Sequence, residues 1–544
     1  MVRARCSRNA ARRGSVRPSS VRATVSPPLV MVGLLIVVLG FLLRLRFLNY
    51  PMRYDESFNY MTFGMKTPWY IVSHYVASNN HILHTLQMRM SVFLFGNTPA
   101  ALRLPALVAG MLLIPASGWL AWALFGHRLS TAVTMLAVAS SSYLVEYSCN
   151  ARGYSLLTLT FTLATVCTVY LFRTPQRRRL WLAWGTLCAL GAFAHPAMLL
   201  GAAGLTAALS VRLFLLPSGD PLRRDGVLGL MMGLASCFAL GLILYAPALL
   251  ITGPIGCYRL LSSGSGVHAA FLREHGGMLQ TTWDAWTRHT PLAWQALIIA
   301  GCAGFAGTAW RKRSRVFLVP LCVLIGLPAL ARLSGLAVTP PAWTFALPLA
   351  LACALYGLFQ WAELLPGNPL NTRASYGLLA LASLAGIGCA FNVSRQSYLS
   401  AWEHELVDVE RILDDCREFG MNRCALLMRY TPATSYYMLR KRMAPTPAAD
   451  ADDVERVYIV ADTLKSVDDL WNPRVPGFDR FRAPELSKHL SRADVFIAYR
   501  KDGDYDGDPT DRPPSLVTRR MSHSWPAPEE TGGDHSGGAK GSRP

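Results

Sequence analysis

An acidic pair, Asp55 and Glu56, follows the first long apolar run of the chain, which extends from Leu29 to Leu43. Placing a carboxylate beside hydrocarbon costs free energy, so an acidic pair at the end of a membrane helix indicates a functional site. We therefore predict Asp55 and Glu56 as catalytic residues. The alternative is a solvated pair at the membrane surface with no part in chemistry.

Cations and histidines recur at the ends of later apolar runs. The residues that we predict to bind substrate are His81, Arg152, Tyr154, His195 and Arg259. A guanidinium suits phosphate oxygens because its N–H groups bind two of them at once. The alternatives are an interfacial anchor for Arg152, a helix-end cap for His195 and a surface position for Arg259. Arg103, in the run Leu-Arg-Leu-Pro, is interpreted as a structural residue at a helix start.

His81 and His84 have the spacing His-x-x-His. On a helix this spacing puts both rings on one face, which metal binding tolerates. The alternative is the polar face of an amphipathic helix. The sequence indicates no definite cofactor. A divalent metal ion is compatible with the two histidines, and we leave the metal ligands unassigned.

The composition indicates a membrane protein with many spans. The chain has 544 residues, of which 52% are hydrophobic and 16% are charged, whereas a soluble domain carries about 25% charged residues. The formal net charge is +20, but the cations lie in an Arg-rich tail and in short loops between apolar runs. Such loops mark the cytoplasmic side of membrane proteins, so we exclude nucleic acid as a partner and expect membrane lipids instead.

Apolar runs near 20 residues predict about eleven spans. They are 29–48, 102–124, 129–146, 154–172, 180–195, 197–215, 227–250, 292–309, 316–334, 342–362 and 375–392. The fifth and sixth are separated by three residues only and are compatible with one bent element. The basic loops place the N-terminus inside, and the loops 49–101 and 251–291 outside with the C-terminus.

The rest of the chain divides by composition. We predict a basic tail over 1–28, a helical membrane domain over 29–393, an extracytoplasmic α/β domain over 394–501 and a disordered tail over 502–544. Within the α/β domain, strands are expected at 423–428, 457–461 and 494–499, with helices at 402–419 and 433–441. Residues 68–95 have the apolar spacing of one interfacial amphipathic helix.

The ordered set of motifs on one face resembles the GT-C glycosyltransferases of the bacterial family 39 type. These are relatives of the dolichyl-phosphate-mannose protein mannosyltransferases and of the lipid A aminoarabinose transferase. The resemblance covers residues 29–395. It implies a polytopic helical fold and transfer of a hexosyl or pentosyl group from a polyprenyl-phosphate carrier. The acceptor would be an extracytoplasmic protein, lipid or glycan, and the transfer would invert the configuration at the sugar.

The resemblance also implies roles for the acidic pair. Asp55 would be the catalytic base that takes the proton of the acceptor hydroxyl, and Glu56 would orient the acceptor or help a metal. The reaction would take place at the outer face of a bacterial cytoplasmic membrane, or in the ER lumen.

The chain departs from this family at two places. Many relatives carry an acid directly before the Ala-Arg pair, where this chain has Asn150, with Glu146 one turn earlier. Many also carry an Arg at the position of Ala342, for which Arg332 is a candidate substitute. A transporter would instead show two related halves with broken helices and acids at mid-span, and a non-catalytic scaffold would make the outer acids incidental.

Overall fold

A computed structural model describes residues 27–263, 277–312, 314–334, 338–364 and 368–396, with short stretches between 424 and 499. The chain divides into two compact units. The helical unit comprises Met1–Tyr50 and Thr62–Tyr398, and the C-terminal unit comprises Pro51–Met61 and Leu399–Pro544. The domain boundaries given above remain a prediction.

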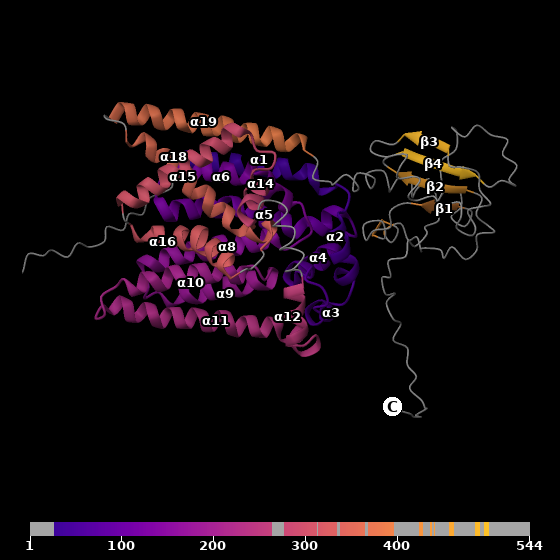
Figure 1. Cartoon of the computed structure of the whole chain (residues 1–544), viewed down its shortest axis with the longest axis horizontal. Helices are drawn as coiled ribbons and strands as arrows, with labels where there is room; N and C mark the ends of the chain where they lie inside the picture. Colours follow the sequence, from indigo (N-terminus) through magenta and orange to yellow (C-terminus); the bar gives the residue numbers. More distant parts are fainter. Residues whose placement is uncertain are drawn as a thin grey trace, which may run out of the picture. The chain divides into compact units, whose positions relative to one another are not determined.

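The helical unit is built from long helices that lie side by side, joined by shorter ones at their ends (Figure 1). The first half contains α1 (Pro27–Leu48), α3 (Pro68–Ser73), α4 (Ile82–Phe95), α5 (Pro99–Phe125), α6 (Arg128–Ser140), α7 (Ser142–Ser148), α8 (Tyr154–Arg173), α9 (Arg178–Ala194), α10 (Met198–Phe214) and α11 (Pro221–Ile251). The second half contains α12 (Pro254–Ser263), α14 (Met278–Thr287), α15 (Leu292–Lys312), η2 (Arg315–Phe317), α16 (Leu318–Pro320), η3 (Leu321–Gly326), α17 (Leu327–Leu333), η4 (Pro340–Ala346), α18 (Leu347–Ala362) and α19 (Asn368–Arg395).

Local sequence explains where these helices begin and end. In α5 the Thr98 side chain accepts a hydrogen bond from the Ala101 amide, and Pro99 occupies the first turn. Both features favour a helix start. The helix ends at Gly126, which has φ 63°, a conformation that glycine adopts at little cost. The 27 residues between are apolar enough to cross a bilayer.

Within the described residues, eight helices are long and apolar enough to cross a membrane, and the bent pair α6–α7 makes nine. The axes of that pair differ by 58°. Each of the eleven predicted runs is helical, and the fifth and sixth are separate helices, α9 and α10. The chain is a multi-pass integral membrane protein.

The prediction of one helix over residues 68–95 is wrong. The structure has α3 and α4, separated by residues 74–81. Asn80 causes the break, because its side-chain amide donates to the Ile71 carbonyl at 3.0 Å and its Oδ1 accepts from Thr85. An asparagine that satisfies backbone groups in this way competes with helical hydrogen bonding.

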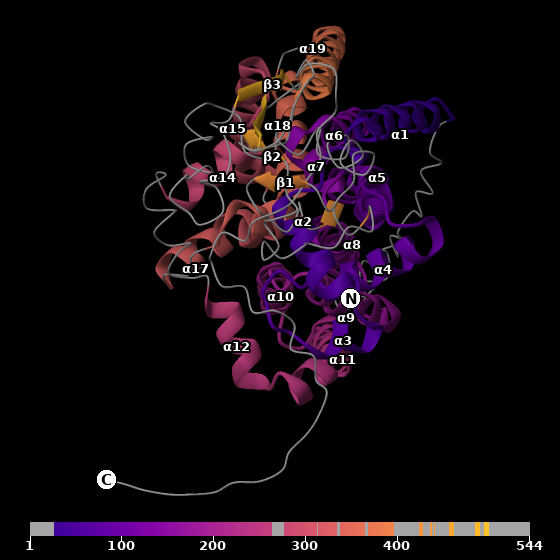
Figure 2. The ribbon, with the colours of Figure 1, turned by 90° about the vertical axis from the view of Figure 1, so that its right-hand side faces the viewer.

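Helices from the two loops that we predicted on the outer face lie at one end of the bundle. The Thr252 hydroxyl, at the end of α11, accepts from the Tyr75 amide at 2.8 Å and donates to the Ser73 carbonyl at 3.1 Å. Helices α3, α4 and α12 therefore gather at this end, which faces the viewer in Figure 2. The turn between α10 and α11 lies at the opposite end (Figure 1).

The C-terminal unit contains α2 (Tyr54–Asn59) and a four-stranded sheet. The strands are β1 (Cys424–Leu427), β2 (Arg456–Ala461), β3 (Glu485–His489) and β4 (Asp494–Tyr499), in the order β1-β2-β4-β3. The β1–β2 pair is parallel and the other two pairs are antiparallel. The Met52 amide donates to the Tyr437 hydroxyl at 2.8 Å, which ties the α2 segment to this unit.

The three predicted strands are confirmed as β1, β2 and β4. Strand β3 was not predicted because its sequence, Glu-Leu-Ser-Lys-His, lacks the β-branched and aromatic residues on which the prediction depended. The predicted helix 402–419, the disordered tail 502–544 and all but three residues of the predicted helix 433–441 lie outside the described residues.

Candidate functional site

The loop that carries Arg152 joins α7 to α8 and is held against α5. The Arg152 amide donates to the Asn150 carbonyl at 2.7 Å, which makes a tight turn. The Ser155 hydroxyl donates to the Tyr147 carbonyl at 2.9 Å and so ties the two helix ends together. At Gly110 of α5, a Cβ atom would lie only 2.1 Å from Ser148 Oγ. The end of α7, where the loop starts, can lie this close to α5 because position 110 has no side chain.

Three predicted residues, His81, Tyr154 and His195, form one aromatic cluster in the helical unit. Their ring centroids are 5.3 Å apart for His81–Tyr154, 4.9 Å for His81–His195 and 4.8 Å for Tyr154–His195. His81 directly precedes α4, Tyr154 begins α8, and His195 follows α9. Three segments far apart in the sequence therefore meet at one point.

Gly153 makes this meeting sterically possible. A Cβ atom on Gly153 would lie 2.4 Å from the Ala194 carbonyl oxygen and 3.1 Å from His81 Cβ. Backbone at the end of α9 thus approaches backbone of the Arg152 loop more closely than any side chain would allow.

Arg152 borders the cluster and is half-buried. Its Nη2 donates to Asn79 Oδ1 at 2.6 Å, and its Cζ lies 5.0 Å from the centroid of the Tyr154 ring. The ring face attracts the guanidinium, and the amide fixes its orientation. Both of these contacts orient the guanidinium.

The two histidines are neutral at physiological pH. Burial, with His195, Arg152 and His84 around it, holds the pKa of His81 well below its usual range. Burial and Arg152 lower the pKa of His195 to about 3. His195 Nδ1 accepts a hydrogen bond from the Ala197 amide at 3.0 Å, so the neutral ring carries its hydrogen on Nε2. A guanidinium beside an imidazole N–H donor is an arrangement that can bind an anion.

The remaining predicted residues lie elsewhere. Asp55 is exposed and Glu56 is buried in α2 of the C-terminal unit, where Glu56 Oε2 accepts from the Arg53 amide at 2.9 Å. One oxygen of Glu56 therefore serves the start of its own helix. Arg259 is exposed on α12, and Arg332 is exposed at the end of α17. Their predicted roles stay predictions.

Metal ligands were left open by the sequence. His84 is fully buried in the first turn of α4, and His81 precedes that turn. Among the residues that the structure describes, no three or more His, Cys, Asp or Glu side chains group in a way that would hold a metal ion. The described side chains give no ligand set on which to base a metal site.

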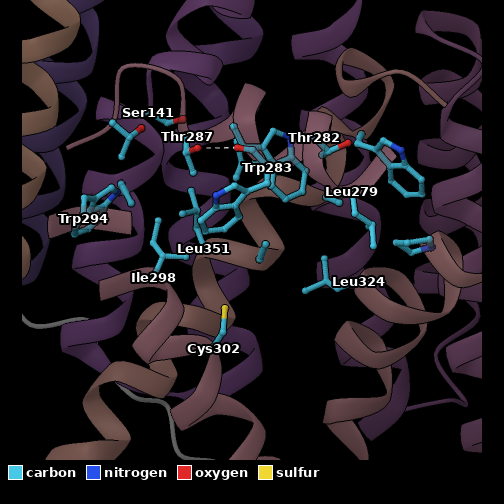
Figure 3. A pocket seen from close by; sticks show the side chains of 18 of the residues that line it. Ser141, Leu279, Thr282, Trp283, Thr287, Trp294, Ile298, Cys302, Leu324 and Leu351 are labelled. Atoms are coloured by element: carbon cyan, nitrogen blue, oxygen red, sulfur yellow. Dashed lines mark hydrogen bonds between the residues drawn. The ribbon is translucent and has the colours of Figure 1, made fainter. Parts of the chain in front are cut away.

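A cavity of about 460 Å³ lies between α14, α15, η3, η4 and α18. Figure 3 shows Ser141, Thr282 and Thr287 in the upper part of the view, and Ile298 and Leu324 below them. The Thr282 and Thr287 hydroxyls donate to carbonyls of their own helix, at 2.7 and 2.8 Å. With these hydroxyls satisfied and tryptophans such as Trp283 and Trp294 in the wall, the interior suits a hydrocarbon group.

Comparison with solved structures identifies the fold. No protein-family model matches the chain, and no curated protein sequence matches it. ArnT from Cupriavidus metallidurans in the apo state superimposes with a TM-score of 0.53 at 13% identity, over 86% of this chain and 97% of that chain. ArnT bound to undecaprenyl phosphate gives a TM-score of 0.52 at 13% identity, over 87% and 98%. The chain has the GT-C fold. The Archaeoglobus fulgidus oligosaccharyltransferase is more distant, with a TM-score of 0.47 at 11% identity over 82% and 71%.

Within this GT-C fold, Arg152, Tyr154, His81 and His195 are brought together, as their common position on one face had predicted. Two members of the arrangement were missed. Asn79 holds Arg152, and Tyr147 stacks edge-on against Tyr154 with centroids 4.9 Å apart. The run Ser78-Asn79-Asn80 consists of residues typical of turns. This signal would have revealed the break between α3 and α4, in which Asn79 lies.

Proposed function

We propose that the chain is an integral-membrane glycosyltransferase that uses a sugar carried on a polyprenyl phosphate. One observation carries the proposal, namely the oriented guanidinium of Arg152 beside the neutral His81–His195 pair at the end of the membrane bundle. A donor of this kind presents a phosphate at the membrane surface and a long apolar chain below it.

The proposed donor fits the chemistry of the described residues. Arg152 supplies the charge for the phosphate oxygens, and His195 Nε2 supplies an N–H donor. The apolar cavity between α14 and α18 suits an isoprenoid segment. The ArnT structure with undecaprenyl phosphate adds support at the level of the fold, since it is a complex with a lipid of this class.

In the proposed reaction, the bond between the sugar C1 and the phosphate oxygen breaks as the acceptor oxygen attacks C1. Negative charge builds on the leaving phosphate, where Arg152 stabilises it most strongly in the transition state. Asp55 takes the proton of the acceptor hydroxyl as general base. Attack from the face opposite the phosphate inverts the configuration at C1. We extend the proposal to an extracytoplasmic acceptor, which is a protein, a lipid or a glycan.

A donor-consumption assay tests the proposal. Membranes from cells that overproduce the chain are incubated with a panel of radiolabelled polyprenyl-phosphate sugars, and membranes from cells lacking it serve as the control. We expect one donor to be consumed only in the first preparation, with release of polyprenyl phosphate. Equal turnover in both preparations for every donor, at verified protein abundance, would reject it.

A further inference from the structure

A group of arginines lies at the opposite end of the bundle from Arg152. Arg212 is in the last turn of α10, Arg223 is in the first turn of α11, and Arg315 begins η2. Helix α10 packs against both α11 and α16, which follows η2 directly. Since α10 has 17 residues and a helix rises about 1.5 Å per residue, Arg212 lies on the order of 20 Å along α10 from His195. This group is therefore separate from the candidate donor site.

Arg212 has an unusual environment for a cation. Its Nη1 is buried, and no acceptor for it is present in the part of the chain that the structure describes. Arg315 lies close enough for the two positive charges to repel, while Asp220 attracts Arg212. Asp220 Oδ1 is already engaged by the Leu222 amide at 2.9 Å, where it starts α11. A buried donor without an acceptor, held near a like charge, indicates a missing anion.

Arg223 completes a basic rim around this point. Its Nη1 donates to Ser218 Oγ at 3.0 Å and so fixes the turn between α10 and α11. Arg315 is exposed, and Arg212 is half-buried between the helix ends. The group thus combines a sheltered guanidinium with an accessible one, both at the ends of membrane helices.

We propose that Arg212 and Arg315 together bind the phosphate group of an anionic phospholipid in the leaflet opposite the candidate donor site. Guanidinium groups bind phosphate oxygens in pairs, and basic pockets between membrane helices bind anionic headgroups. The lipid phosphate relieves the repulsion between the two arginines and supplies the acceptor that Arg212 Nη1 lacks. It also links α10 to the η2–α16 segment. The inference does not depend on the proposed glycosyltransferase function.

The test is a lipid titration of the intact purified chain in an uncharged detergent. The midpoint of thermal unfolding is followed as phosphatidylglycerol, phosphatidylcholine with the same acyl chains, or inorganic phosphate is added. We expect phosphatidylglycerol to raise the midpoint at much lower concentration than either of the others. Inorganic phosphate as effective as phosphatidylglycerol would indicate a simple anion site, and equal responses to the two lipids would indicate binding through acyl chains only. Either result overturns the proposal.

Variants locate the site. Arg315→Gln, at an exposed position that tolerates substitution, should weaken the apparent affinity for phosphatidylglycerol about tenfold, the usual effect of losing a charge-assisted hydrogen bond. Arg212→Lys keeps the positive charge but loses the planar guanidinium group, so it should also weaken the affinity for phosphatidylglycerol. Arg224→Gln, which removes a neighbouring exposed charge on α11, should leave the affinity within about twofold. Wild-type affinity in both Arg315→Gln and Arg212→Lys would refute the assignment.

Discussion

Arg152 is held by Asn79, through a hydrogen bond of 2.6 Å between Nη2 and Oδ1. The acceptor is a neutral amide, which orients the guanidinium through a hydrogen bond. A carboxylate at the same position would orient it equally well and would also add a negative charge beside it. This difference leads to the first prediction.

Asn79→Asp should weaken donor binding. The new carboxylate would pair with Arg152 and withdraw charge from the phosphate, so we expect the affinity for a polyprenyl-phosphate donor to fall about tenfold. Thermal stability should be unchanged or higher. Equilibrium binding of labelled donor measures the effect, and Asn97→Asp, which adds a charge in the α4–α5 loop, is the matched control. Equal donor affinity in Asn79→Asp and wild type would mean that Arg152 does not contact the donor phosphate.

Gly153→Ala should disturb the meeting of the three loops. The added Cβ would lie 2.4 Å from the Ala194 carbonyl oxygen, and relieving such a clash costs about 1–3 kcal/mol. We expect a lower midpoint of thermal unfolding together with a loss of donor turnover. Gly219→Ala is the matched control, because a Cβ at that position meets no atom within 4 Å. If the two variants had the same unfolding midpoint and the same donor turnover, the close approach at Gly153 would not contribute to stability or activity.

Acid should destabilise the chain through His81 and His195. Burial is the main cause that lowers both pKa values in the folded protein, whereas the unfolded chain takes up protons near pH 6.5. Stability is therefore complete above pH 6.5 and falls with decreasing pH, by up to about 1.4 kcal/mol per pH unit for each histidine. Unfolding midpoints measured from pH 7.5 to 5 should decline, and less steeply in His81→Gln than in wild type or in His74→Gln. An identical slope in all three would contradict the assignment of neutral buried histidines.

Asp55→Asn should abolish most of the turnover and leave donor binding intact. General-base catalysis contributes about 10²–10⁴-fold, and asparagine preserves the size of the side chain. Initial rates at equal membrane abundance measure the effect, with Asp225→Asn, at an exposed position on α11, as the control. A rate close to wild type in Asp55→Asn would remove the acidic pair from the chemistry.

The membrane architecture was predictable because an apolar run of about 20 residues has few alternatives to a membrane helix. Residues 154–172, for example, were predicted as a span and lie within α8. The bend between α6 and α7 was not predicted, because it depends partly on a tertiary contact. The Ser141 side chain caps the start of α7 locally, but Arg44 Nη1, far away in the sequence, donates to the Ala139 carbonyl at 3.0 Å beside the bend.

The candidate site was predictable only in part. Spacing along the chain put His81, Arg152 and His195 on one face, but the contacts between them depend on how α4, α8 and α9 pack. Asn79 lies 73 residues from Arg152 in the sequence, and nothing local in either segment specifies the pair. Gly153 could not be recognised from the sequence either. It matters because the missing side chain lets the Ala194 carbonyl come close.

The most direct test of the central claim is equilibrium binding of a labelled polyprenyl phosphate to the purified chain. The account predicts saturable binding by wild type and at least about tenfold weaker binding by Arg152→Ala, with partial recovery in Arg152→Lys because a point charge returns without the fork. Arg128→Ala, which removes an exposed arginine at the start of α6, should bind as wild type does. Binding that is absent in wild type, or unchanged in Arg152→Ala, would contradict the account.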